Sequence, residues 1–182
     1  MAEEKKSSSS APANNNGAAN GAAADTTAAE QQFIIERVYI KDISFEAPNS
    51  PAIFTEEWEP DTSLNLNTQV NVLGDDHYEV ELHLNVTVKG KDGKTAFLVE
   101  AVQAGAFLIK GYAADQLNHL LASYCPGQLF PYAREVISNL VSKGSFPEMH
   151  LSPINFDALY AKNLTEQHEA AAAAAESKDA EA

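Results

Sequence analysis

The sequence is short of cysteine and of positive charge, and each shortage excludes a class of protein. Cys125 is the one cysteine among 182 residues, so no intrachain disulfide forms and nothing indicates an oxidising compartment. Lys and Arg number 12 against 26 Asp and Glu, which gives a net charge of −14 and disfavours nucleic acid or an anionic membrane as a partner. A basic or zinc-bearing partner fits this charge better.

Long apolar runs are also missing. The lysines of the N-terminal stretch Met1–Lys6 lead into serines, with no apolar segment behind them, which does not fit a signal peptide. Elsewhere polar residues or glycine interrupt each apolar run within about ten residues, whereas a transmembrane helix needs roughly 20. We therefore expect a cytoplasmic protein that does not insert into the membrane.

Composition divides the chain into three parts. Residues 1–32 consist almost entirely of Ser, Ala, Asn, Gly, Thr and charged residues, so they are predicted to be a disordered low-complexity tail. Residues 33–164 hold the aliphatic and aromatic residues and are long enough for one domain with a single core. Residues 165–182 are rich in Ala and Glu without an apolar stripe, which predicts a flexible tail.

Strict alternation of apolar and polar residues predicts strands in the central part. It is clearest over 63–73 and 78–89, and strands are also expected over 95–109 and 34–46. Short Gly/Asp turns separate the last three strands along the chain, as in an antiparallel meander. A proline-rich segment, residues 47–60, connects the first strand to the meander and suits a loop that crosses the sheet.

Helical spacing follows the strands. Residues 113–124 and 131–143 are predicted helices, the second with an apolar stripe and with Gly144 as its C-cap. A last helix is expected to begin within 153–155 and to place its apolar residues on one side. The fold class is therefore α+β, a four-stranded antiparallel sheet with a crossing loop and with helices packed on one face.

Residues that carry catalysis or bind metals form no recognisable set. The five histidines stand far apart, and Cys125 is interpreted as a buried structural thiol. No phosphate-binding glycine loop or nucleophile motif is present, and Asp75-Asp76 is interpreted as a solvated turn. We predict no catalytic residue, no metal and no cofactor, while a cofactorless enzyme with a closed pocket stays open as an alternative.

One face of the sheet mixes carboxylates with aliphatic side chains. The even positions from Ile34 to Glu46 include both kinds, and the even positions over 96–104 place Glu100 among aliphatic residues. If these sides join Glu79 and Glu81, the protein presents a flat acidic surface suited to docking a partner. Packing against another subunit or a helix explains the same pattern equally well.

Aromatic side chains also occur in the crossing segment and beside Pro131 and Pro147. They are Phe54, Trp58, Phe130, Tyr132 and Phe146. Loop aromatics commonly close the edge of a core, and they also line grooves that accept unrelated extended chains. Both interpretations remain at this point.

Several blocks of the sequence together resemble the SecB family of export chaperones. They are Lys41-Asp42-Ile43-Ser44-Phe45-Glu46-Ala47-Pro48-Asn49, Ser123-Tyr124-Cys125-Pro126, Leu129-Phe130-Pro131-Tyr132-Ala133-Arg134-Glu135 and Pro153-Ile154-Asn155-Phe156-Asp157-Ala158-Leu159. The resemblance runs from about Phe33 to Leu164 with the blocks in order. The two tails lie outside it.

The resemblance implies a homotetramer, built as a dimer of dimers, that binds unfolded secretory preproteins without ATP and passes them to the SecA motor. The positions that match the docking site of the zinc-binding C-terminal tail of SecA are Asp42, Glu46, Leu98 and Glu100. Those that match a subunit-interface strand are Val99, Ala101 and Gln103. The substrate groove of the family points to Phe54, Trp58, Phe156 and Tyr160.

A narrower alternative keeps the chaperone activity and redirects it to a dedicated client such as a toxin–antitoxin pair, as in some proteins similar to SecB. The acidic positions that face SecA in the resemblance argue against that alternative.

Overall fold

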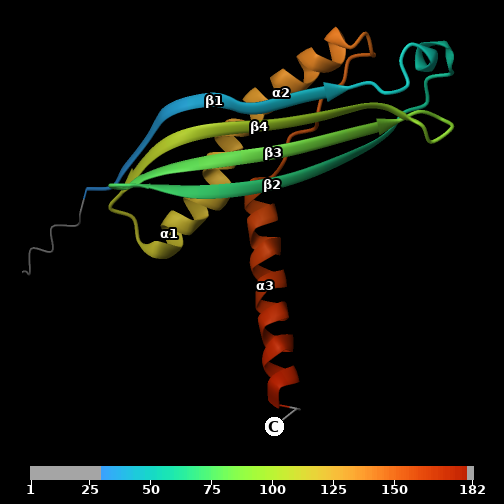
Figure 1. The fold of residues 1–182 in the computed structure, drawn as a ribbon. Helices are drawn as coiled ribbons and strands as arrows, with labels where there is room; N and C mark the ends of the chain where they lie inside the picture. Colours follow the sequence, from blue (N-terminus) through green and yellow to red (C-terminus); the bar gives the residue numbers. More distant parts are fainter. Residues whose placement is uncertain (1–29, 180–182) are drawn as a thin grey trace, which may run out of the picture.

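The computed structural model describes residues 30–179, with side chains described as far as Ala170. Its centre is one antiparallel sheet with the strand order β1-β4-β3-β2 (Figure 1). The strands are β1 (Gln32–Glu46), β2 (Asp61–Gly74), β3 (His77–Lys89) and β4 (Thr95–Lys110). The predicted four-stranded sheet is confirmed. The disordered tail was predicted over residues 1–32; residues 1–29 lie outside the described residues, and Gln32 already belongs to β1.

Residues 47–60 connect β1 to β2, which form opposite edges of the sheet, so this segment crosses the sheet as predicted. It contains one 3-10 turn, Ala52–Thr55, where the sequence suggested no regular structure. The Asn49 side-chain amide donates a hydrogen bond to the Thr95 carbonyl at 2.9 Å, and Ile53 is buried. The crossing segment is therefore anchored at the end of the sheet where the turn between β3 and β4 lies.

The turn between β2 and β3 explains its two aspartates. Asp75 and Asp76 have φ values of 50° and 62°, and Gly74 before them has a φ of 98°. Left-handed backbone of this kind suits a two-residue hairpin turn and is tolerated by Asp better than by most residues. The aspartates are accounted for by the turn itself.

After β4 the chain forms one continuous helical rod. It consists of α1 (Ala114–His119), a π-helical turn (Leu120–Tyr124) and α2 (Cys125–Lys143). The two separate helices predicted over 113–124 and 131–143 are thus joined through residues 125–130. Pro126 directly follows the π-helical turn, and the Cys125 N–H bonds to the Leu120 carbonyl, five residues back.

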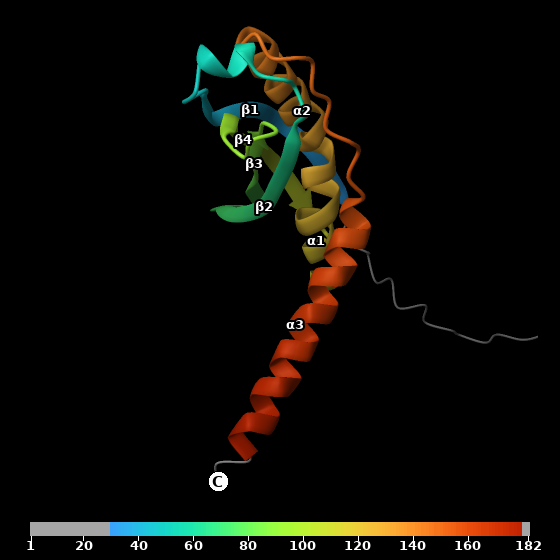
Figure 2. The ribbon, with the colours of Figure 1, turned by 90° about the vertical axis from the view of Figure 1, so that its right-hand side faces the viewer.

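Helix α2 packs on one face of the sheet, mainly against β4 and β3, as Figure 2 shows. Gly105 on β4 permits this close approach, because a Cβ there would lie 2.9 Å from Leu129 and 2.8 Å from Phe107. The stripe predicted for the second helix is buried at Ala133, Ile137 and Val141. Covering of the apolar face by helices is confirmed.

The last helix, α3 (Phe156–Asp179), starts against the rod and then runs away from the body of the molecule (Figures 1 and 2). Asn155 caps it, since its side-chain oxygen accepts the Ala158 N–H at 3.0 Å. The helix continues through residues 165–179, and the flexibility predicted for this tail stays a prediction. Within residues 30–179, no helix is both long and apolar enough to cross a membrane.

Candidate functional site

The sheet has a covered face, on which α2 packs, and an open face, on which no helix of residues 30–179 lies. In β4, Leu98 and Glu100 lie on the open face beside Thr87 and Asn85 of β3. The register also places Glu79 and Glu81 of β3 on the open face, which confirms the prediction that they share a face with Leu98 and Glu100.

Strand β1 departs from simple alternation at two bulges, one at Glu36 and one at Lys41. Each bulge shifts the pairing by one residue and exchanges the faces of the residues beyond it. Val38 and Ile40, between the bulges, therefore lie on the covered side, and the prediction that every even residue from Ile34 to Glu46 shares one face is wrong at these two positions.

The four residues predicted to dock SecA do share the open face. Glu46 lies directly opposite Leu98, while Glu100 pairs with Ser44 one step along the same two strands. The carboxylates of Asp42, Glu46 and Glu100 are exposed, and none forms an ion pair with a described residue. This end of the open face thus carries uncompensated negative charge around one leucine.

The opposite part of the open face is closed by a polar network. Lys41 donates to Glu79 Oε2 at 2.9 Å and to Glu81 Oε1 at 2.6 Å, reaching across β4 to β3. Asn71 of β2 donates to the same two oxygens at 2.9 and 2.8 Å, and the Tyr39 hydroxyl donates to Glu79. The two glutamates are consequently 9% and 6% exposed although no helix covers them.

These contacts shift the ionisation of the network. The hydrogen bond from Tyr39, followed by those from Asn71 and Lys41, lowers the pKa of Glu79 to about 2. The same bond, which favours the neutral hydroxyl, raises the pKa of Tyr39, and the two glutamates raise the pKa of Lys41. Because hydrogen bonds to a carboxylate favour its charged form, Glu79 is ionised throughout the physiological range.

We predict that Glu79 makes the folding stability pH-dependent in acid. Its folded-state pKa lies below the ordinary value of 4.5, so its contribution is fully present above about pH 4.5 and is lost as the pH falls toward 2. Glu79→Gln should lower the free energy of unfolding by roughly 1–3 kcal/mol at pH 7. It should also flatten the decline below pH 4.5, measured by urea denaturation at several pH values.

Glu148→Gln is the matched control, because that carboxylate is 80% exposed and makes only a 3.8 Å contact with His150. It should leave both the stability at pH 7 and the acid slope near those of the unmodified protein. Identical acid slopes for the Glu79 variant and the unmodified protein would contradict the assignment.

The residues that match a subunit-interface strand lie on the covered face. Val99, Ala101 and Gln103 are 0%, 3% and 3% exposed, beneath the chain's own helix. Their side chains lie on the other face of β4 from Leu98 and Glu100, as alternation predicted. Gln103 donates from its amide to the backbone carbonyl of Tyr39 at 2.7 Å, which ties β4 to the edge strand β1.

An aromatic cluster lies where the crossing segment meets the end of α2. Phe146 is its centre, with ring centroids 5.1 Å from Phe54, 5.8 Å from Trp58 and 4.7 Å from Phe97. Phe146 is nearly buried, whereas Phe54 and Trp58 remain 48% and 38% exposed. The structure therefore brings together the two groove residues predicted in the crossing segment.

The two groove residues predicted on α3 lie elsewhere. Phe156 is buried against Phe130, with ring centroids 5.8 Å apart, and Tyr160 packs edge-on against His119 at 5.4 Å. Phe156 mainly fixes the start of α3. Tyr160, which is half-buried, also lines a cavity.

The covered side of β2 connects these two regions. One cavity near the crossing segment is lined by Trp58, Phe97 and Thr62, and a second, of about 240 Å³, by Leu66, Val70 and Tyr160 among others. The covered side of β2 lines both, and Leu64 between them is 37% exposed on the same side. We call this surface, from Trp58 along β2 to Tyr160, the β2 trough.

Acidic residues of the crossing segment are held by two lysines of the β3–β4 turn. Lys91 lies 2.8 Å from Glu57 and 3.0 Å from Glu59, and Lys94 lies 3.0 Å from Glu56. The lysine side chains are more than half exposed, so these pairs add little stability and are screened by salt. They orient the segment that carries Phe54 and Trp58.

Three residues of catalytic types do converge between the rod and α3. Ser123 donates to Asp157 Oδ1 at 2.6 Å, and His119 Nε2 lies 3.0 Å from the same oxygen. In a nucleophilic triad the histidine stands between the other two, whereas here the aspartate does. The arrangement fastens α3 to the rod.

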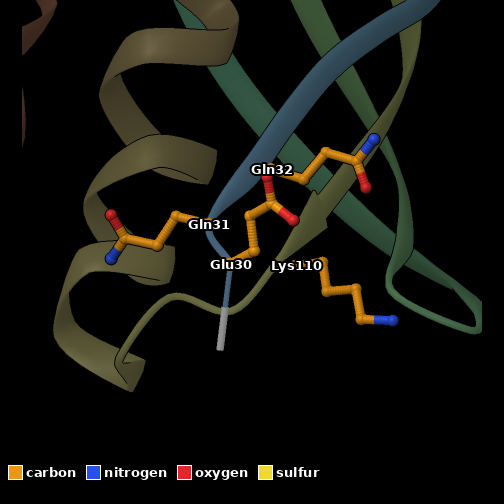
Figure 3. Close-up of a pocket in the computed structure, with 4 residues that line it drawn as sticks. All are labelled: Glu30, Gln31, Gln32 and Lys110. Atoms are coloured by element: carbon orange, nitrogen blue, oxygen red, sulfur yellow. The ribbon is translucent and has the colours of Figure 1, made fainter. Parts of the chain in front are cut away.

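The single cysteine lies in the core. Cys125 is fully buried, and burial raises the pKa of its thiol to about 12, which suppresses the reactive thiolate. Among residues 30–170, no group of His, Cys, Asp and Glu is arranged to hold a metal ion. Figure 3 shows a cavity where β1 begins and β4 ends, lined by Glu30, Gln31, Gln32 and Lys110, which includes none of the predicted site residues.

Known proteins are similar to this sequence over most of its length. The family described as preprotein translocase subunit SecB matches residues 26–167. The chain belongs to the SecB family. The protein-export protein SecB of Pseudomonas savastanoi pv. phaseolicola is 55% identical over 139 residues, which cover 76% of this chain and 85% of that protein. Its counterpart in Legionella pneumophila is 54% identical over 142 residues, covering 78% of this chain and 87% of the relative.

A solved structure shares the SecB fold. The SecB-like chaperone of Mycobacterium tuberculosis, solved in complex with an antitoxin peptide, superposes with a TM-score of 0.57 at 14% identity. The match covers 67% of this chain and 90% of that one. At this identity the likeness supports the fold alone, and it agrees with the α+β class predicted from the sequence.

Several residues of the SecB-like site escaped the sequence analysis. Phe146 was noted as a loop aromatic but not as the centre of a cluster, and Lys41 was seen only within a sequence block. Their roles depend on partners more than 35 positions away in the sequence, as the separation of 38 positions between Lys41 and Glu79 illustrates. The Phe146-Pro147 pair next to a helix end was the available signal for the first.

Proposed function

We propose that this SecB-family chain is an ATP-independent chaperone that holds unfolded preproteins and delivers them to the SecA motor for export. The observation that carries the proposal is the separation of two unlike surfaces on one small domain. The open face presents free carboxylates around Leu98, whereas the β2 trough on the other side presents exposed apolar side chains. One chain thereby has room for a receiver and a client together.

The open face suits a basic, zinc-bearing segment such as the C-terminal tail of SecA. Asp42, Glu46 and Glu100 carry charge that no described cation neutralises, and Leu98 offers a half-buried apolar contact between them. Complementary charge speeds association and fixes the register of the partner. We assign docking to these four residues.

The β2 trough suits extended, unfolded client chains. Client chains share exposed backbone and apolar side chains rather than a fixed shape, so an adaptable apolar surface beside a free strand edge is the fitting receptor. Phe54 and Trp58 lie at one end of the trough and Tyr160 at the other. Phe156, which is 6% exposed, supports the trough by holding α3 in place.

The exposed apolar residues of β1 support assembly into a homotetramer, a dimer of dimers. Ile35, Ile40 and Ile43 lie on the covered side at the sheet edge, beyond the reach of α2, and are 39–47% exposed. A second copy would remove them from water at about 25 cal/mol per Å² of apolar area. Val99, Ala101 and Gln103 would affect such an interface indirectly, because they set the position of α2 and β1.

The same proposal places the protein in the cytoplasm and gives it no catalytic activity. SecB is not a family of enzymes. Ser123 and His119 bond to the same oxygen of Asp157 and so hold α3 against the rod. Holding a client requires no cofactor, because the apolar surface itself supplies the binding energy.

Titration of the purified protein with an unfolded secretory precursor, and separately with a zinc-loaded peptide of the SecA tail, tests the proposal. Light scattering should give the mass of four 19.6 kDa chains, about 78 kDa, and both ligands should bind without ATP. Binding of the precursor alone would indicate a holding chaperone with another receiver. Failure of both would overturn the proposed function.

A further inference from the structure

The bulge at Lys41 decides which side chains of β1 reach the open face. Ile40 pairs with Gln103 and Asp42 pairs with Val102, so Lys41 is an extra residue with no partner of its own on β4. Deviations of this kind re-aim the side chains that follow them. Here the residues that follow include Asp42 and Glu46, two of the four residues assigned to docking.

Regular pairing of β1 with β4 would move Asp42 and Glu46 from the open face to the covered face. Without the extra residue, Lys41 would oppose Val102 and Asp42 would oppose Ala101, which lies on the covered face. A one-residue slip exchanges the faces of all later residues of a strand. Asp42 and Glu46 would then point toward the helix side, and Ile43 and Phe45 toward the open face.

On the open face, the Lys41 side chain secures the bulge. It crosses β4 to reach Glu79 and Glu81, two strands away. Glu81 and Glu79 pair with Ala104 and Ala106 of β4, whose small side chains leave room for the lysine to cross the strand. Ala104 is fully buried on this face, which shows how tightly the network closes over it.

On the covered face, Gln103 secures the backbone of β1 two residues before the bulge. Its amide donates to the Tyr39 carbonyl at 2.7 Å, and the side chain is nearly fully buried. A buried amide that lost this acceptor would be left without a hydrogen-bond partner unless it followed the strand, so the bond opposes any slip of β1.

We propose that Lys41 and Gln103 are positioning residues for partner docking, holding the β1 bulge from opposite faces so that Asp42 and Glu46 point to the open face. The inference rests on the proposed docking of SecA. Neither residue needs to touch the partner, since each acts through the register of β1.

The effect of Lys41→Met separates positioning from simple electrostatics. The substitution removes a positive charge from an acidic face, so long-range attraction alone predicts tighter binding of a basic peptide. Positioning predicts the reverse, a roughly tenfold rise in the Kd for the zinc-loaded SecA tail peptide, because the bulge is released. Lys89→Met is the matched control, since it removes the same charge from an exposed lysine that forms no ion pair with a described residue.

Two further variants guard against loss of folding. Lys41→Arg keeps both ion pairs and should retain the affinity of the unmodified protein. Gln103→Leu leaves the charge unchanged and should weaken docking by a similar factor, with circular dichroism and mass reporting the fold and the assembly. Equal affinity of the Lys41→Met and Lys89→Met variants, in folded protein, would overturn the proposal.

Hydrogen exchange of the free protein provides a readout that needs no partner. Amides around the bulge, residues 39–42, should exchange roughly tenfold faster in the Lys41→Met and Gln103→Leu variants, and β3 should change less. If the unmodified protein fails to bind the peptide, the proposed docking is wrong. The exchange result then still decides whether Lys41 and Gln103 hold the bulge, and unchanged exchange would overturn that.

Discussion

Replacing Glu100 with lysine is expected to weaken docking of the SecA tail peptide at least tenfold while the affinity for unfolded clients stays unchanged. Glu100 is exposed on the open face and has no cationic partner among the described residues, so its charge is available to a ligand. Reversing the charge places like charges together, which costs several kcal/mol at a desolvated contact. Isothermal titration with the peptide and with an unfolded precursor would measure the two affinities.

The separation of the two surfaces explains why client binding should survive. Glu100 points away from the β2 trough, which lies on the covered side of the sheet. Glu100→Gln should give an intermediate loss, and Glu169→Lys, an exposed charge reversal on α3, should affect docking only through net charge. Equal loss of both activities in the Glu100→Lys variant would show that the two sites are not separate.

Phe146→Ala is expected to destabilise the protein by about 3–5 kcal/mol and to weaken client binding. Phe146 is 6% exposed and contacts aromatic rings from the crossing segment, β1 and β4. Its removal leaves Phe54 and Trp58 without support. Urea denaturation would measure the first effect, and titration with an unfolded precursor at low temperature the second.

Trp58 makes this prediction easy to follow, because it is the only tryptophan of the chain and packs 5.8 Å from Phe146. Its fluorescence should shift to the red in the Phe146→Ala variant as the indole becomes more exposed. Phe107→Ala is the control, since Phe107 is fully buried against Phe33 at the other end of the sheet. That variant should lose similar stability with unchanged client affinity, and a loss of client affinity equal to that of the Phe146 variant would contradict the role of the cluster.

Local patterns were sufficient for the elements of the fold. Alternation over 63–73 and 78–89 predicted β2 and β3 to within two residues, because one face of each strand meets the core and the other does not. The helix boundaries were less predictable. The sequence analysis ended one helix at residue 124 and began the next at residue 131, whereas the structure continues through Pro126 and Pro131 in one rod with a π-helical turn.

The candidate site was predictable in part. The resemblance to SecB selected Asp42, Glu46, Leu98 and Glu100, and the register places all four on the open face. The sequence analysis also grouped Phe54 and Trp58 with Phe156 and Tyr160 of α3, but the structure places Tyr160 at the far end of the β2 trough and buries Phe156 against the rod. Distances between residues far apart in sequence depend on how the helices pack on the sheet, and local periodicity does not predict that packing.

The sequence by itself determined the strands, the helices, the acidic character and the family of this protein, because these follow from composition, local spacing and shared blocks of residues. Only the tertiary structure decided where β1 bulges, and hence which way Asp42 and Val38 point. A bulge is set by the pairing of two strands and by side chains that reach it from elsewhere, here Gln103 and the glutamates of β3. Alternation counted along one strand contains no information about such partners.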